Sequence, residues 1–208
     1  MIRVSTTTIE AYRRLVETEY GTDAELIDQV KGKPWAPTWQ MEDGTAWHTA
    51  LEEGTHPLFL ASDIAAGRRH IGLGIWEVKQ TRTFDLGWTL VNVVAKADHM
   101  RGLLIQDNKA TFTTVDAHKY EQSLQWRFYL LCHECPAFRY NVYAFKEPRN
   151  DTELYLLKEI ASFTFWAYED LERDCTAWVR RFADWAQARG LLGYLQREGS
   201  SMGVEHAA

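Results

Sequence analysis

Cysteine, proline and long apolar runs are scarce in this chain. The 208 residues include 3 cysteines and 5 prolines. An odd cysteine count without a secretory signal argues against a disulfide framework, so we expect reduced thiols. No apolar run approaches the roughly 18 residues that a membrane-spanning helix needs, and the N-terminus lacks the basic and then apolar segments of a signal peptide. The sequence therefore predicts a cytoplasmic protein that does not contact a membrane.

The composition is that of a folded domain with an acidic balance. Hydrophobic residues make up 46% of the chain and its length suits one domain, so we expect residues 1–208 to form a single domain. Its tail, from about residue 199, should be disordered. The formal net charge of −6 is unusual for a nucleic-acid-binding protein, which usually carries a basic patch. Net charge excludes little, however, when acids gather at a metal site and bases lie elsewhere.

Residues 96–109 carry the most informative local pattern. They read as two short strands joined by a turn that starts at Gly102, since glycine suits the first central position of a type II′ turn. This register places Asp98 directly opposite Asp107, with Cβ atoms about 5 Å apart. Lys109 is two residues beyond Asp107 and therefore shares its face. The pattern predicts two carboxylates and an ammonium at one spot, although a solvent-facing hairpin with scattered charges would fit the same residues.

Two carboxylates this close favour a cation between them. They repel each other unless one is protonated or a positive ion separates them. Mg²⁺ and Mn²⁺ bind carboxylates together with water and phosphate oxygens, so Asp98 and Asp107 predict a site for either ion. Such an ion lowers the pKa of water and stabilises negative charge on phosphorus. We expect Lys109 to hold the attacking water or to neutralise that charge.

Four motifs in a fixed order resemble the PD-(D/E)XK nuclease superfamily. They are Gly44-Thr45-Ala46-Trp47-His48, Asp98, Asp107-Asn108-Lys109 and Gln125-Trp126-Arg127-Phe128-Tyr129. The order is similar to that of the RecB-type and lambda-exonuclease-like branch, which has a GxxxH helix, an aspartate, a (D/E)xK strand and a QxxxY helix. The chain departs from the pattern in two places, since no proline precedes Asp98 and an aspartate stands at 107 where glutamate is often found.

The resemblance implies a fold, an activity and partners. The fold is α/β with a restriction-endonuclease-like core, in which helices flank a central mixed β-sheet. The implied activity is metal-dependent cleavage of DNA by Asp98, Asp107 and Lys109, with Gln125 and Tyr129 positioning the DNA backbone or the lysine. Duplex ends or single strands are the implied DNA partners. A homo-oligomeric ring and a single-strand annealing protein are further implications of the same resemblance.

A third metal ligand is expected on the helix that precedes the hairpin. His48 and Glu52 are four residues apart in a segment of helical spacing, residues 41–53, so they share one face. An imidazole beside Asp98 and Asp107 would extend the metal shell, so we expect His48 as a ligand and Glu52 as a weaker candidate. The alternative is a surface helix whose two side chains meet only water.

Two competing motifs are rejected on spacing. Glu77-Val78-Lys79 would need Asp63 as its partner, but it lies in a long alternating stretch and no QxxxY helix follows it. Cys132-His133-Glu134-Cys135 and Cys175 offer a zinc site, yet CxxC alone is a weak signal and the chain lacks the four thiolates of an iron–sulfur cluster. We therefore expect these cysteines to be loop and core thiols.

Two pairs of residues are candidates for direct contact with nucleic acid. Arg101 and Lys119 are tied by sequence to the hairpin and to the helix after it, so they are candidates for phosphate contacts, and the alternative is that both are solvated surface charges. Trp35 and Trp39 lie in a proline-broken loop, residues 32–39, from which they could stack on an unpaired base. The alternative is a loop that packs onto the body of the protein.

The remaining patterns predict the order of elements. We expect helices at 6–19, 41–53, 115–131 and 168–189, and a further helix that begins at the capping box in residues 22–25. Strands are expected at 70–80, 83–96, 103–109, 138–146 and 157–166. On the helix 115–131, a polar stripe should contain His118, Gln122, Gln125 and Tyr129.

The metal-site pattern and the resemblance together imply a metal-dependent deoxyribonuclease, and the resemblance further implies an end-dependent exonuclease of phage-type recombination or repair. The chain has no GxxxxGK[ST] loop, so no ATP-driven motor is expected. Two alternatives stay open. One is a catalytically silent nuclease-fold domain that binds DNA or protein, and the other is a structure-specific or restriction-type endonuclease.

Overall fold

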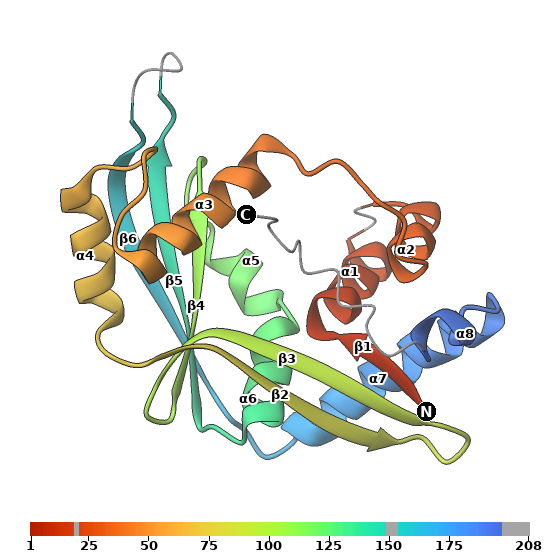
Figure 1. The fold of residues 1–208 in the computed structure, drawn as a ribbon. Coiled ribbons are helices and arrows are strands. Elements are labelled where there is room, and N and C mark those ends of the chain that lie inside the picture. Colours follow the sequence, from red (N-terminus) through yellow and green to blue (C-terminus); the bar gives the residue numbers. More distant parts are fainter. Residues whose placement is uncertain (19–20, 149–153, 197–208) are drawn as a thin grey trace.

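The computed structural model describes residues 1–18, 21–148 and 154–196, in which runs of helices separate runs of strands (Figure 1). The elements are β1 (Ile2–Ser5), α1 (Thr6–Glu17), α2 (Asp23–Val30), α3 (Trp39–Glu53), α4 (Ala61–Ile71), β2 (Ile75–Asp85), β3 (Leu90–Arg101), β4 (Leu104–Thr111), α5 (Ala117–Gln122), α6 (Gln125–His133), β5 (Ala137–Lys146), β6 (Leu156–Trp166), α7 (Leu171–Ala188) and α8 (Leu192–Leu195). None of the helices described is long and apolar enough to cross a membrane. The tail predicted to be disordered lies outside the described residues.

The strands form one mixed sheet. Its order is β1-β3-β4-β5-β6, and β2 pairs with β3 outside this path. β1 runs parallel to β3 and β4 parallel to β5, whereas the β2–β3, β3–β4 and β5–β6 pairs are antiparallel. The predicted α/β class with a central mixed sheet is confirmed.

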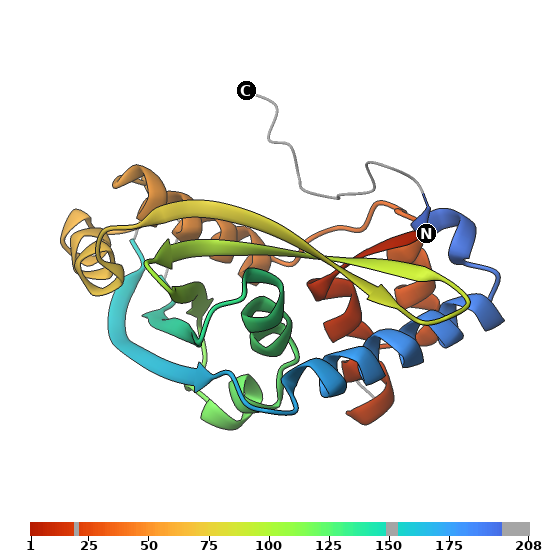
Figure 2. The ribbon, with the colours of Figure 1, turned by 90° about the horizontal axis from the view of Figure 1, so that it is seen from below.

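Helices cover both faces of the sheet, as Figure 2 shows. One apolar core joins the sheet to α1, α6 and α7 and includes Phe128, Val179 and Phe182. The other joins it to α3 and α4 and includes Trp47 and Tyr143, whose ring centres are 5.0 Å apart. Full burial of one large apolar side chain stabilises a fold by about 1.5–3 kcal/mol. The two cores therefore hold α3 and α6 firmly on opposite sides of the central strands.

The β3–β4 hairpin has the predicted register. His99 pairs with Gln106, and one further step of this register sets Asp98 opposite Asp107. Gly102 opens the turn with a φ of 59°, a conformation that glycine adopts without steric cost. Regular pairing of the two strands stops at His99 and Gln106, while β4 continues along β5. The strands thus diverge at the two aspartates, which leaves room for their side chains.

The helix α4 was not predicted, and its first half occupies residues for which the sequence patterns indicate no element. A strand was expected from residue 70, but α4 runs to Ile71 and ends at Gly72, whose φ is 79°. Gly67 explains how the helix packs, because an added Cβ would lie 2.7 Å from Leu51 Cδ2. The four-residue strand β1 was missed as well, since so short a segment shows no clear alternation.

The turn between β2 and β3 lies later than predicted. The expected break followed residue 80, where no turn-forming residue stands. The observed turn contains Gly87, with a φ of 85°, and a hydrogen bond from the Leu86 N–H to the Thr89 carbonyl at 3.0 Å. Glycine at a positive φ, rather than the end of the alternating pattern, decides where this hairpin reverses.

The predicted helix 115–131 is in fact two helices, α5 and α6. The chain breaks at Ser123, whose extended backbone lets its hydroxyl accept the Gln125 N–H at 3.1 Å. Glu10, on α1, accepts the Leu124 N–H at 2.7 Å and holds the break in place. The predicted polar stripe is therefore divided, and His118 lies on the short exposed helix α5.

Candidate active site

Two aspartates meet where β3 and β4 diverge. Asp98 Oδ2 accepts the backbone N–H of Asn108 at 2.8 Å, so the carboxylate takes the place of the missing ladder partner. Asp107 precedes Asn108 on β4, and its side chain is only 2% exposed, against 22% for Asp98. One carboxylate is therefore sealed in the protein while the other borders solvent.

Lys109 joins this pair from the same strand. Its Nζ lies 2.7 Å from Asp107 Oδ2, and about a third of its side chain is exposed. The predicted convergence of Asp98, Asp107 and Lys109 is what the structure shows. Because the ammonium neutralises a buried carboxylate and still reaches the surface, it can meet a ligand that enters from solvent.

Gln125 and Tyr129 approach the same carboxylate from α6. Gln125 Nε2 donates to Asp107 Oδ1 and to the Tyr129 hydroxyl, both at 3.3 Å. The Tyr129 hydroxyl in turn donates to the backbone carbonyl of Lys96 at 2.6 Å. The two residues are one helical turn apart, so the QxxxY spacing lets α6 grip β3 and β4 at once.

His48 reaches the cluster from α3, and Glu52 does not take part. His48 Nδ1 lies 3.4 Å from Asp98 Oδ2. Glu52 is exposed one turn later, and its backbone carbonyl accepts a hydrogen bond from Arg68 at 3.0 Å. The structure thus brings together His48, Asp98 and Asp107, the three residues expected to bind a metal ion.

The electrostatics of the cluster follow from burial. Burial raises the pKa of the Asp107 carboxyl to about 6. The nearby Lys109 ammonium lowers this pKa, and the Asp98 carboxylate raises it further. Burial on its own lowers the pKa of an ammonium, yet the two neighbouring carboxylates leave the pKa of Lys109 above its ordinary value. Burial likewise raises the pKa of the Tyr129 hydroxyl, which therefore stays protonated and donates. At neutral pH the cluster holds an ionised pair inside the protein.

This electrostatics predicts how stability depends on pH. Burial raises the pKa of Asp107 from its ordinary value of 3.8 to about 6 in the folded protein. Since the folded state binds the proton more tightly, the carboxylate destabilises the fold above pH 6, and this cost fades as the pH falls from about 6 to about 4. Asp107→Asn imitates the protonated form, so its free energy of unfolding should gain on wild type as the pH rises through that window. Urea unfolding in chelator-treated buffer measures the difference, and a gap that stays constant with pH would contradict the assignment.

The donors suit a hard divalent ion, although the side chains are not arranged around one. In the described part of the chain, no group of three or more His, Cys, Asp and Glu side chains is placed to hold a metal. The reason is visible at Asp107, where the Lys109 ammonium lies beside Oδ2. That oxygen is buried, and the ammonium is the cation that neutralises it in this structure. Two carboxylates with one imidazole are nevertheless a donor set that fits Mg²⁺ or Mn²⁺.

A groove of about 530 Å³ opens beside the cluster. It is lined by Met41, Gly44, Thr45, His48, Lys109 and Ala110. Gly44 costs a helix interior about 1 kcal/mol relative to alanine, and a Cβ added there would meet nothing within 4 Å. Glycine is therefore not needed for packing inside the protein, and its effect is to widen this groove.

The two tryptophans predicted to contact nucleic acid, Trp35 and Trp39, lie in different local structures. Trp39 is the first residue of α3 and packs against Phe112, which directly follows β4, with ring centres 5.0 Å apart. Trp35 remains in the preceding loop and is 56% exposed. The alternative for this segment was a loop that packs onto the body of the protein. It does not fully describe either ring, because Trp39 lies in a helix and Trp35 is largely exposed.

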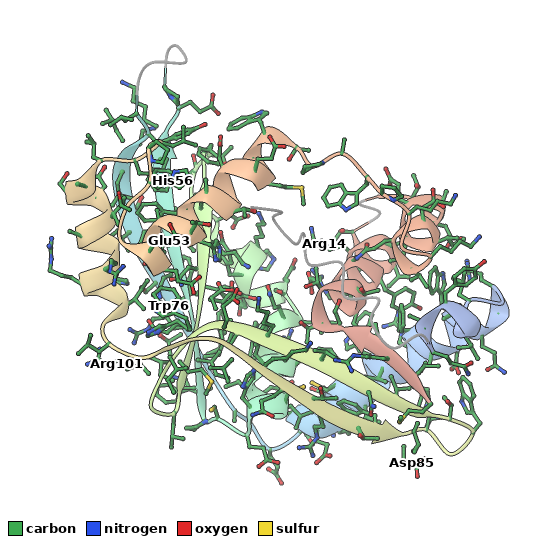
Figure 3. All side chains as sticks on the ribbon, in the orientation of Figure 1. Arg14, Glu53, His56, Trp76, Asp85 and Arg101 are labelled. Atoms are coloured by element: carbon green, nitrogen blue, oxygen red, sulfur yellow. The ribbon has the colours of Figure 1, made fainter. Side chains whose placement is uncertain are left out.

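The two predicted basic contacts lie away from the carboxylates. Arg101 stands at the turn end of β3 (Figure 3), where Gly72 borders its guanidinium. Lys119 is exposed on α5, with Nζ 5.9 Å from the ring centre of Tyr120. Neither makes a contact with the cluster, so their role in binding phosphate stays a prediction.

Tyr120 is a neighbour of the site that the sequence patterns did not single out. Burial raises the pKa of its hydroxyl, and Lys109 lies near enough to oppose that shift. Its ring stacks on Phe163 with centres 5.4 Å apart. The signal in the sequence was its place between the Asp107-Asn108-Lys109 motif and the Gln125–Tyr129 motif. This place does not distinguish Tyr120 from an ordinary core tyrosine.

The rejected motifs are engaged elsewhere. Glu77 forms a 2.6 Å ion pair with Lys96 on the sheet, and Asp63 accepts the Leu157 N–H at 3.0 Å. The three cysteines are buried and free, as expected. Burial raises the pKa of Cys132 to about 12, which keeps it a thiol.

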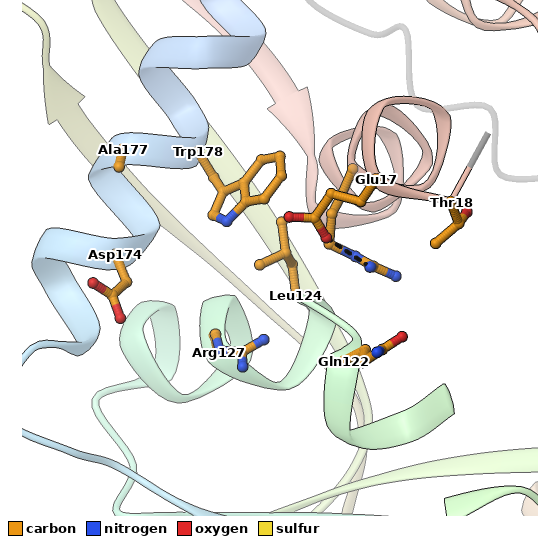
Figure 4. A pocket seen from close by; sticks show the side chains of 9 residues that line it. Glu17, Thr18, Gln122, Leu124, Arg127, Asp174, Ala177 and Trp178 are labelled. Carbon is orange, nitrogen blue, oxygen red and sulfur yellow. Dashed lines mark hydrogen bonds and ion pairs between the residues drawn. The ribbon is translucent and has the colours of Figure 1, made fainter. Parts of the chain in front are cut away.

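A second hollow, of about 600 Å³, lies between α1, α6 and α7 (Figure 4). Its charges are already paired. Arg13 binds Glu17 at 3.0 Å, and Arg127 donates to the Ser123 carbonyl at 3.0 Å while it lies over the ring of Trp126. Because these cations are neutralised or stacked, the hollow offers a ligand less than the groove beside Lys109 does.

Comparisons with known proteins identify the fold. Neither a protein-family model nor a curated protein matches the sequence. The alkaline exonuclease from Laribacter hongkongensis matches with a TM-score of 0.55 and 13% identity, covering 94% of this chain and 92% of that one. Its complex with dAMP matches with a TM-score of 0.50 at 13% identity, covering 93% and 91%. A phage-related exonuclease from Haemophilus somnus matches with a TM-score of 0.54 at 11% identity, covering 91% and 96%. The chain thus has the fold of these exonucleases, which agrees with the fold that the motifs predicted.

Proposed function

We propose that this protein is a metal-dependent deoxyribonuclease that degrades DNA from an end. The observation that carries the proposal is the convergence of Asp98, Asp107, Lys109 and Gln125 at the point where two strands diverge. A buried carboxylate costs the fold stability, and ion pairing in the interior seldom repays that cost fully. A cluster that the fold retains at such a cost is best explained by chemistry.

In this proposal each residue of the cluster has one role. Asp98, Asp107 and His48 would hold Mg²⁺ or Mn²⁺, and the ion when bound would lower the pKa of water and polarise the scissile phosphate. Lys109 would orient the attacking water or neutralise charge on the phosphate, since its ammonium is fixed beside Asp107. Gln125 and Tyr129 would position Asp107 and the strand that carries it.

The neighbours in fold support the choice of substrate. Two of them are described as exonucleases, and one was solved in complex with dAMP. The groove beside Lys109 adds support from this chain itself, because an ammonium beside Met41, Gly44 and Ala110 suits a phosphate with its sugar. Trp39, two residues before Met41 on α3, would offer a surface on which a base could stack. The ring-shaped assembly, the annealing partner and a place in phage-type recombination stay predictions.

The proposal predicts which DNA is cut. With Mg²⁺ or Mn²⁺, linear duplex should be degraded progressively to mononucleotides and single strand, while covalently closed circles of the same sequence survive. Gel analysis and release of acid-soluble nucleotides measure both, with chelated samples as the blank. A nicked circle shows whether an internal break suffices as an entry point.

Other outcomes would select the alternatives. Linearisation of closed circles as fast as digestion of linear DNA would replace the exonuclease by a restriction-type or structure-specific endonuclease. Binding of linear DNA without cleavage under any divalent ion would instead indicate a catalytically silent nuclease-fold domain.

A further inference from the structure

A row of buried polar side chains crosses the sheet on the face that turns away from Asp107. It runs from His99 on β3 through Gln106 and Asn108 on β4 to Asn141 on β5, all fully buried, and reaches Ser162 on β6. Because side chains alternate along a strand, Gln106 and Asn108 face opposite to Asp107 and Lys109. The row is thus the reverse side of the catalytic strand.

Hydrogen bonds join the row from strand to strand. Asn141 Nδ2 donates to Gln106 Oε1 at 3.0 Å and to Asn108 Oδ1 at 3.2 Å. Ser162 donates to Asn141 Oδ1 at 3.2 Å, and Gln106 Nε2 lies 3.1 Å from His99 Nδ1. Gln106 also donates to the Ile71 carbonyl at 3.0 Å, which ties the row to the end of α4.

The row coincides with the register of the sheet. His99 is the direct partner of Gln106, Asn108 of Asn141, and Asn141 of Ser162. A slip by one residue between any two strands would turn one partner to the opposite face and leave buried amides unpaired. Each unpaired buried amide costs about 1–3 kcal/mol, so the row strongly favours a single register.

Stability alone does not account for the row. It adjoins an apolar core that contains Trp47 and Tyr143, and replacing both partners of a buried hydrogen bond by apolar groups of the same shape can leave stability nearly unchanged. What the row does fix is the position of Asn108. This residue stands between Asp107 and Lys109, and its own N–H holds Asp98 Oδ2 at 2.8 Å.

We infer that Asn141 and Asn108 are positioning residues for the candidate active site. The side chain of Asn141 anchors Asn108 from the opposite face of the sheet, so that the backbone N–H of Asn108 holds Asp98 and its two chain neighbours, Asp107 and Lys109, keep their places, with Lys109 at the groove. The inference rests on the proposed function for its consequence in catalysis, but the anchoring itself is a property of the fold.

The test uses Asn141→Leu, which keeps the number and branching of the side-chain heavy atoms and removes the hydrogen bonds. Amide exchange of Asn108, followed by NMR, should become at least tenfold faster than in wild type, and kcat on linear DNA with Mg²⁺ should fall at least tenfold with KM changed less than threefold. Phe145→Leu is the matched control, because Phe145 is almost as buried on the same strand and faces the same side as Asn141, but packs on Trp47 and Phe59. It should lower thermal stability without either effect.

The outcomes separate the inference from the proposed function. Unchanged Asn108 exchange in Asn141→Leu would overturn the inference, whatever the activity. If Asn108 exchanges faster in Asn141→Leu but the wild-type protein cleaves no DNA, the anchoring would be supported and the nuclease proposal would be removed. If Asn141→Leu fails to fold, Ser162→Ala tests the exposed end of the row. The amide exchange of Asn108 should then become at least twofold faster than in wild type. An unchanged exchange rate would count against the inference.

Discussion

Asp107→Asn should abolish DNA hydrolysis while the protein stays folded. The substitution keeps the shape and the hydrogen bond from Gln125 but removes the charge that faces Lys109. A loss of at least a thousandfold in kcat is expected, which corresponds to about 4 kcal/mol of transition-state stabilisation. Asp98→Asn should act alike, because its carboxylate is the second oxygen donor of the cluster. Initial rates at saturating Mg²⁺ measure the loss, with circular dichroism as the check on folding.

Glu77→Gln is the matched control for both variants. It also removes one carboxylate from the sheet, but at an exposed ion pair with Lys96 and outside the cluster. Exposed pairs contribute about 0–1 kcal/mol, so stability and rate should stay near those of wild type. If Asp107→Asn retained a tenth or more of the wild-type rate, the cluster would not be the catalytic site. Loss of activity in Glu77→Gln would revive the second acid-x-lysine motif.

Lys109→Ala should lower turnover by at least two orders of magnitude and leave DNA affinity nearly unchanged. The ammonium is held by Asp107 at 2.7 Å rather than extended over an open basic surface, so its effect should be on the transition state. A hundredfold loss corresponds to about 3 kcal/mol. Single-turnover rates and filter binding in Ca²⁺ would separate the two quantities.

Lys79→Ala removes a lysine of the same type from the competing motif and is expected to change neither quantity. An equal loss of affinity and rate in Lys109→Ala would reassign Lys109 to anchoring of phosphate. The two lysines thus test whether the position beside Asp107, and not positive charge in general, is what matters.

Local sequence determined the hairpin and the spacing of the motifs. Gly102 fixed the turn, and the turn fixed the register that sets Asp98 opposite Asp107, because a two-residue turn leaves no freedom in the pairing that follows. The spacing of four residues between Gln125 and Tyr129 likewise sufficed to put both on one side of a helix. These features depend on contacts between near neighbours in the chain, which the sequence shows directly.

Only the tertiary structure decided which elements meet. The contact between His48 and Asp98 joins residues far apart in sequence, and the break before α6 depends on Glu10, which comes from the first helix. The buried amides of Asn108 and Asn141 look like ordinary polar strand residues until β4 and β5 are paired. A sequence fixes turns and faces through short-range sterics, whereas these contacts arise when distant segments pack together and bury their polar groups, so no pattern along the chain contains them.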